Sequence, residues 1–250
     1  MSLSKSIFLG GASLTLDQDP FSDGSQIGYY NFDLNVNNQV PTGFNNGSAN
    51  NLSYSTTKIR GTRSGDFEIS GGGTGSTYID IGSPGQSLVS RSVSLWVRFE
   101  STATRMMLID GGDRPSTAYA YGSVHLDFRG NESPQRLIGV FAKYNGAQYG
   151  SISVDWSPST GTWYHIVHVS TANGHRIYIN GSNYTNGSSI NRSSDSPTSY
   201  NSSVRVGGDK RYGSPQEEYD GLIDELRFFS KALSSSEVST LYNGGSGFQG

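Results

Sequence analysis

The chain has 250 residues, 33 of them glycine, with 12% aromatic residues, no cysteine and a net charge of −3. Without cysteine it has no disulfides or thiolate metal sites, and its slightly negative charge excludes a broad attraction to nucleic acid. No stretch approaches the roughly 18 apolar residues of a membrane-spanning helix. The abundance of glycine and the lack of long helical runs favour an all-β protein.

Residues 1–26 have mixed polarity, and we expect them to form an extension that docks onto other proteins. The apolar run at residues 6–14 is diluted by glycine and serine and is soon followed by Asp17 and Asp19. This pattern argues against a secretion signal. We therefore expect the protein to be made in the cytoplasm without an export signal.

From residue 27 onward, short segments of alternating polarity follow one another at intervals typical of a β-sandwich. In residues 93–99 and 163–169 every second side chain is apolar or aromatic, which predicts half-buried strands. Residues 176–181 end in Asn180-Gly181, a pair that readily takes the positive φ angles of a two-residue hairpin turn. An antiparallel return is therefore expected there.

Near the end of the chain, residues 221–228 predict a strand and residues 235–242 a short helix. Ser234 and Glu237 have the spacing of a capping box. Apolar positions then fall on one helical face, and the glycines at 244 and 245 can end the helix. We expect this helix to dock on the sandwich.

Six segments resemble, in the same order, the laminin-G-like branch of the concanavalin A-like lectin/glucanase superfamily. They are residues 29–38, 61–70, 78–81, 93–97, 161–181 and 221–245. The resemblance implies a jelly-roll sandwich of two antiparallel sheets with one short C-terminal helix, spanning residues 27–250. The preceding residues 19–25 resemble the segment before such domains in proteins of marine bacteriophages and their hosts, which implies a virion component.

Glucanases share the implied fold, and their retaining chemistry needs two carboxylates about 5 Å apart. The family supplies them as Glu-x-Asp-x-x-Glu on one strand. The nearest match is residues 218–223, where Ile223 replaces the last acid, so we expect no enzymatic activity. His165 and His168 should lie on opposite faces of one strand and cannot share a metal. We expect His165 to pack inside and His168 on the other sheet face.

Asp224 lies between Leu222 and Leu226 on one strand face, so its carboxylate is expected to meet apolar surroundings. A charge buried there is costly without a partner. A calcium ion or backbone amides would satisfy it. An arginine would do so as well, and the candidates are Arg60, Arg63 and Arg227.

Asp33, Asn35 and Asn37 form a loop of hard oxygen ligands, which suit calcium. Laminin-G-like domains often carry a structural calcium, and these three residues with Asp224 are its candidate ligands here. Asn38 stands where relatives tend to have aspartate, which lowers the expected affinity. The alternative is a network of salt bridges without an ion.

Aromatic side chains are plentiful in the expected loops and predict a surface for a glycan or a protein partner. Aromatic faces stack on sugar rings, and surface tyrosine equally suits protein contacts, so the two uses stay open. The candidates are Tyr119, Tyr121, Tyr144, Tyr149, Trp156, Arg211 and Tyr212.

Together these features predict a non-enzymatic bacteriophage virion protein, either a tail fibre or knob or a capsid decoration. Residues 1–26 would dock on other virion proteins, and the lectin-like module would attach to host-surface polysaccharide. We expect an oligomer within an assembly and no membrane insertion. The alternatives are a bacterial carbohydrate-binding module or secreted glycan-active protein, and a purely structural assembly protein.

Overall fold

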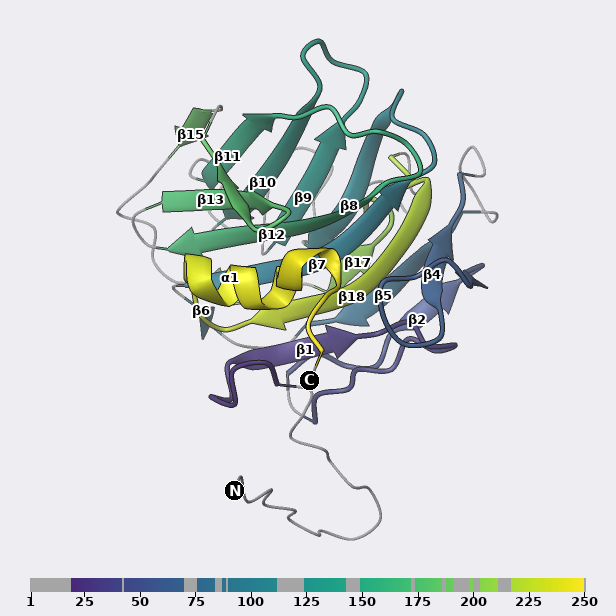
Figure 1. Ribbon diagram of the computed structural model, residues 1–250, viewed down its shortest axis with the longest axis horizontal. Coiled ribbons are helices and arrows are strands. Elements are labelled where there is room, and N and C mark those ends of the chain that lie inside the picture. Colours follow the sequence, from purple (N-terminus) through teal and green to yellow (C-terminus); the bar gives the residue numbers. More distant parts are fainter. Residues whose placement is uncertain are drawn as a thin grey trace, which may run out of the picture.

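The computed structural model describes residues 19–41, 43–69, 76–83, 87–88, 90–111, 124–142, 149–171, 174–185, 188–190, 198–199, 203–210 and 217–249. In this part of the chain no helix is long and apolar enough to cross a membrane. Two eight-stranded antiparallel sheets stack face to face (Figure 1). The all-β jelly-roll sandwich expected from the sequence is therefore confirmed.

The first sheet, sheet A, has the strand order β14-β13-β12-β7-β18-β4-β3, and β1 also pairs with β18. Its strands are β1 (Gln26–Tyr30), β3 (Ser53–Ser55), β4 (Ser64–Phe67), β7 (Arg91–Phe99), β12 (Trp163–Thr171), β13 (Gly174–Ile179), β14 (Ser182–Tyr184) and β18 (Gly221–Phe229). The expected turn at Asn180-Gly181 joins β13 to β14, with φ of 51° and 76°.

The second sheet, sheet B, has the order β15-β11-β10-β9-β8-β17-β5-β2. Its strands are β2 (Ser48–Asn50), β5 (Tyr78–Gly82), β8 (Arg105–Gly111), β9 (Val124–Arg129), β10 (Arg136–Ala142), β11 (Tyr149–Asp155), β15 (Ser188–Ile190) and β17 (Val204–Val206). A small third sheet pairs β6 (Ser87–Leu88) with β16 (Thr198–Ser199).

The core lies between the two sheets because each strand turns one set of alternating side chains inward. Phe99 of sheet A lies 4.9 Å from Phe128 of sheet B, measured between ring centres. Trp156 meets both rings edge-on, at 5.8 and 5.9 Å. Aromatic rings bury large areas and favour such edge contacts, so this cluster ties the sheets together.

The helix α1 (Ser235–Tyr242) lies over the outer face of sheet A (Figure 1). Its capping box is present: Ser234 accepts from the Glu237 amide, and the Glu237 side chain accepts from the Ser234 amide. A 3-10 turn (Asn243–Gly245) follows. The buried side chains Val238 and Leu241 form a second apolar cluster with Leu233 and with Val167, Val169, Tyr178 and Phe229 of sheet A.

Residues 19–26 pack on the sandwich, so the domain begins before the boundary expected between residues 26 and 27. The ring of Phe21 lies 5.4 Å from that of Phe229. Asp23 forms a 2.5 Å ion pair with Lys231, and Gln26 already belongs to β1. The segment is polar apart from a few residues, so its composition did not indicate that Phe21 would pack on the sandwich.

His165 and His168 lie on opposite faces of β12 as expected, but the inward-facing residue is His168. A Cβ on Gly139 of sheet B would come within 2.7 Å of the His168 ring. His165 lies on the outer face near α1, with its Nε2 2.8 Å from Ser94 Oγ. The sequence could not assign the faces because α1 buries the outer face of β12 as well.

Candidate functional site

The outer face of sheet B carries charged side chains at its centre. Alternate residues of β9 belong to the core, so His125, Asp127 and Arg129 point outward. This face was not expected from the sequence, although apolar and charged residues alternate strictly over 124–129 and could have indicated it. We call the following side chains the charged face of sheet B: Arg105, Asp110, His125, Asp127, Arg129, Glu132, Arg136 and Glu217.

The strand register places three arginines side by side on this face. Arg105 of β8 pairs with Arg129 of β9, which pairs with Arg136 of β10. Neighbouring strands lie about 4.8 Å apart, and like charges directly opposite each other destabilise a sheet. The three guanidinium groups therefore need interposed counter-charges.

Asp127 supplies the central counter-charge. Its side chain is fully buried, and its Oδ2 lies 2.6 Å from Arg105 Nη2 and 3.2 Å from Arg129 Nε. Arg105 reaches a second carboxylate through Nη1, which lies 2.7 Å from Glu217 Oε1. Burial alone would raise the pKa of Asp127, but hydrogen bonds from His125 and Arg105 outweigh burial and lower it.

Glu132 is the counter-charge between the other two arginines. Its Oε1 accepts from Arg129 Nη1 at 3.0 Å, and its Oε2 accepts from Arg136 Nε at 2.6 Å. Burial would raise the pKa of Glu132, but the two arginines outweigh burial and lower it. Positive and negative groups thus alternate without a break from Glu217 to Arg136.

His125 extends the network toward β17. Its Nδ1 lies 3.2 Å from Asp110 Oδ1, and its Nε2 lies 3.6 Å from Asp127 Oδ2. The other oxygen of Asp110 accepts from the Lys210 amide at 2.9 Å. Burial alone would lower the pKa of His125, but its two carboxylate partners outweigh burial and raise it. The arrangement favours an imidazolium held between two carboxylates.

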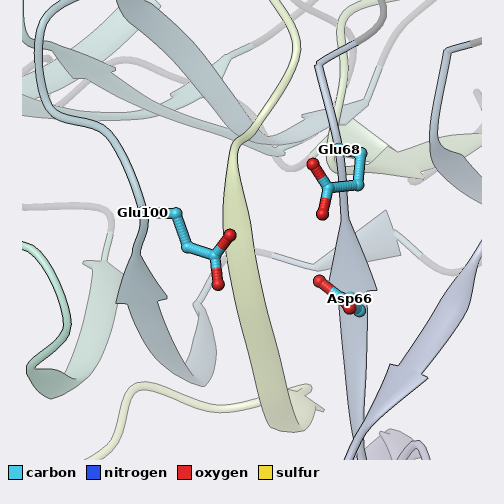
Figure 2. A group of neighbouring side chains, drawn as sticks. All are labelled: Asp66, Glu68 and Glu100. Carbon is cyan, nitrogen blue, oxygen red and sulfur yellow. The ribbon is translucent and has the colours of Figure 1, made fainter.

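A second charged group lies at one end of strands β4 and β7 of sheet A. Carboxylate oxygens of Asp66, Glu68 and Glu100 all lie within 4.8 Å of one another (Figure 2). Burial and the adjacent negative charges raise the pKa of Glu68 and Glu100, and also that of Asp220. Three carboxylate oxygens are ligands that a hard cation such as calcium accepts. None of these residues was among the expected calcium ligands.

The structure gives Asp224 backbone amides as partners. The residue is fully buried, its Oδ2 accepts from the amides of Ile59 and Arg60 at 2.8 and 3.1 Å, and its Oδ1 accepts from the Glu225 amide at 2.9 Å. Burial and the neighbouring Glu225 raise the pKa of Asp224 to about 8 despite these donors. Asp224 thereby anchors the segment that precedes β4.

Asp33 holds the same segment a few residues further on. Its Oδ1 accepts from the amide of Thr62, from Thr62 Oγ1 at 2.9 Å and from the Arg63 amide at 2.9 Å. Asn35 and Asn37 bond to each other locally, through the Asn37 amide and Asn35 Oδ1 at 2.9 Å. The structure thus joins Asp33 and Asp224 through residues 59–63, and calcium at these four residues stays a prediction.

Most of the expected loop contacts lie outside the described residues, namely Tyr119, Tyr121, Tyr144, Arg211 and Tyr212. Tyr149 is the first residue of β11 and pairs with Ala142. Trp156 is only 7% exposed and belongs to the core, so the expectation of an exposed ring is wrong there. Its neighbours Phe99, Phe128 and Tyr164 already surround the indole.

The sequence profile of the concanavalin A-like lectin/glucanases superfamily matches residues 72–239. The chain belongs to this superfamily. A search of the curated proteins found none that matches this chain.

Several solved structures share the fold. One is domain 4 of an extracellular arabinanase from Geobacillus stearothermophilus in complex with arabinotriose, with 21% identity and a TM-score of 0.60, covering 86% of this chain and 97% of that one. Another is the binding domain of botulinum neurotoxin serotype D, with 18% identity, a TM-score of 0.64 and coverage of 88% of this chain. The toxin domain has also been solved with N-acetylneuraminic acid. This chain spans about half of the toxin domains, 51% of their length.

Proposed function

We propose that the protein is a non-enzymatic, lectin-like module that binds glycans through the charged face of sheet B. The observation that carries this proposal is the outward network of arginines and carboxylates on that sheet. The arabinanase domain supports it, because a domain of the same fold and nearly the same extent was solved with a bound oligosaccharide.

The chemistry of the charged face suits sugar hydroxyls. A hydroxyl group donates one hydrogen bond and accepts others, so paired guanidinium and carboxylate groups offer it both kinds of partner. On sheet A, α1 and the segment around Phe21 already cover part of the outer face. We therefore favour sheet B as the glycan-binding surface.

We propose that the charged face has no catalytic role, because its candidate acid and base groups are inaccessible to a substrate. Asp110, His125 and Asp127 would be the candidate acid and base groups, yet they are only 1%, 4% and 0% exposed. General acid–base catalysis needs the catalytic group within hydrogen-bond reach of its substrate. The family's second catalytic acid is also replaced by Ile223. A glycan-active enzyme is the alternative, and release of reducing sugar from glucans, galactans or arabinans would establish it.

We further propose that the module serves host attachment on a bacteriophage virion. Support comes from the resemblance of residues 19–25 to the segment that precedes such domains in phage proteins. Residues 19–26 pack on the domain, and residues 1–18, the rest of the segment expected to dock on other virion proteins, lie outside the described residues. The remaining alternative is a protein that serves assembly alone.

The experiment is a glycan array probed with the purified chain, followed by host-adsorption assays in which bound glycans compete with particles that carry the protein. We expect binding to at least one glycan class and competition by that class. Binding to no glycan would reject the lectin function. Glycan binding without any effect on adsorption would leave a carbohydrate-binding module and reject the virion role.

A further inference from the structure

We propose that the Glu132 end of the charged face contacts a neutral, hydroxyl-rich oligosaccharide, with Arg129 and Arg136 as its specificity-determining donors. This inference rests on the proposed glycan-binding function and names its ligand class and contact residues. It assigns the ligand to one part of sheet B, where β9 and β10 lie side by side.

These groups are accessible, unlike the buried centre of the face. The side chains of Arg129, Arg136 and Glu132 are 31%, 36% and 28% exposed. Within the described chain, Arg129 Nη2 and Arg136 Nη1 donate to no protein acceptor. Two guanidinium nitrogens on adjacent strands are therefore available to a ligand.

Glu132 fixes both guanidinium groups before any ligand arrives. It accepts from Arg129 Nη1 at 3.0 Å and from Arg136 Nε at 2.6 Å, so the remaining donors keep a defined orientation. A pre-positioned planar guanidinium loses less freedom on binding than a mobile side chain does. The adjacent N–H donors of a planar guanidinium group suit neighbouring hydroxyls on one sugar ring.

Charge balance decides the ligand class. The charged face has three arginines and four carboxylates, with His125 between two of the carboxylates. A charged His125 makes the formal charge of these eight described residues zero and a neutral one makes it −1, so they carry no excess positive charge that would attract an anion. A uronate or sialic acid would have to compete with Glu132 for the same guanidinium groups. A neutral sugar leaves every ion pair intact.

The test is a glycan array that carries neutral arabino-, galacto- and gluco-oligosaccharides beside uronate- and sialic-acid-containing ones. The best neutral binder is then titrated by calorimetry at about 50 mM and about 500 mM NaCl, where screening lengths differ severalfold. We expect neutral binders only, with less than about a twofold change in affinity between the two salt concentrations. Arg136→Ala should weaken binding about tenfold, because a charge-assisted hydrogen bond is lost.

Arg98→Ala is the matched control, because Arg98 is 26% exposed and pairs with Glu100 at 3.5 Å on sheet A. It should bind like the unmodified chain. Preferential binding of acidic glycans, with affinity falling as salt rises, would overturn the ligand class and leave the glycan-binding function standing. Equal affinities of the two variants would overturn the assigned contact residues. Binding to no glycan would reject the function itself.

Discussion

Replacing Asp127 with asparagine should destabilise the folded protein by about 3 kcal/mol. The carboxylate is fully buried and receives Arg105 Nε at 3.0 Å, Arg105 Nη2 at 2.6 Å and Arg129 Nε at 3.2 Å. Removing one partner of a buried ion pair costs about 3–5 kcal/mol. We take the lower end because Arg105 and Arg129 are 26% and 31% exposed and can recover some hydration.

The same substitution should flatten the dependence of stability on pH. The pKa of Asp127 is lowered by folding, so its contribution is present above the unfolded value near 4 and is lost as the pH falls below it. The pKa of His125 is raised, so its contribution is complete below about 6.5 and is lost as the pH rises through the folded value. Asp127→Asn removes the first slope and weakens the second.

Urea unfolding followed by tryptophan fluorescence measures both effects, since Trp156 lies in the core. Asp23→Asn is the control, because Asp23 is 41% exposed and its pair with Lys231 should contribute at most about 1 kcal/mol. A loss below about 1 kcal/mol for Asp127→Asn, with an unchanged pH profile, would refute the ion-pair account of this face.

Three further predictions concern other parts of the sandwich. Asp224→Ala removes the carboxylate that accepts from three backbone amides, and it should lower the free energy of unfolding by about 3 kcal/mol and speed hydrogen exchange at the amides of Ile59 and Arg60. If those amides stay protected, Asp224 does not anchor this segment. Glu100→Gln removes one of the neighbouring carboxylates whose pKa values are raised, so it should raise the melting temperature at pH 7 and reduce the stabilisation that acidification to pH 5 produces. A lower melting temperature in metal-free buffer would contradict this. Trp156→Phe should lower the melting temperature while leaving glycan affinity unchanged, and a loss of affinity without a loss of stability would place the indole in the binding surface.

Local patterns predicted much of the fold. The capping box at Ser234 and Glu237 and the turn at Asn180-Gly181 depend on neighbouring residues alone, and both are present. The faces of β12 depend on what packs against it. Since α1 covers its outer face, alternation could not show that His168 is the inward-facing residue.

The candidate site was harder to predict, because it depends on the register between strands. Arg105, Arg129 and Arg136 lie on three separate strands, and the pairing of β8, β9 and β10 aligns them. The partners of Asp224 also depend on the tertiary fold, since Ile59 and Arg60 lie more than 160 positions away in the sequence. The alternation of apolar and charged residues in β9 is visible in the sequence, but it does not indicate which residues of the neighbouring strands complete the ion-pair network.

An NMR titration of the labelled chain with the best array binder tests most directly whether the outer face of sheet B binds the glycan. We expect the shifted backbone amides to cluster in β8, β9 and β10 and around Glu132, with little change in α1 and β12. Shifts confined to sheet A, or centred on the acidic group of Asp66, Glu68 and Glu100, would contradict glycan binding by sheet B.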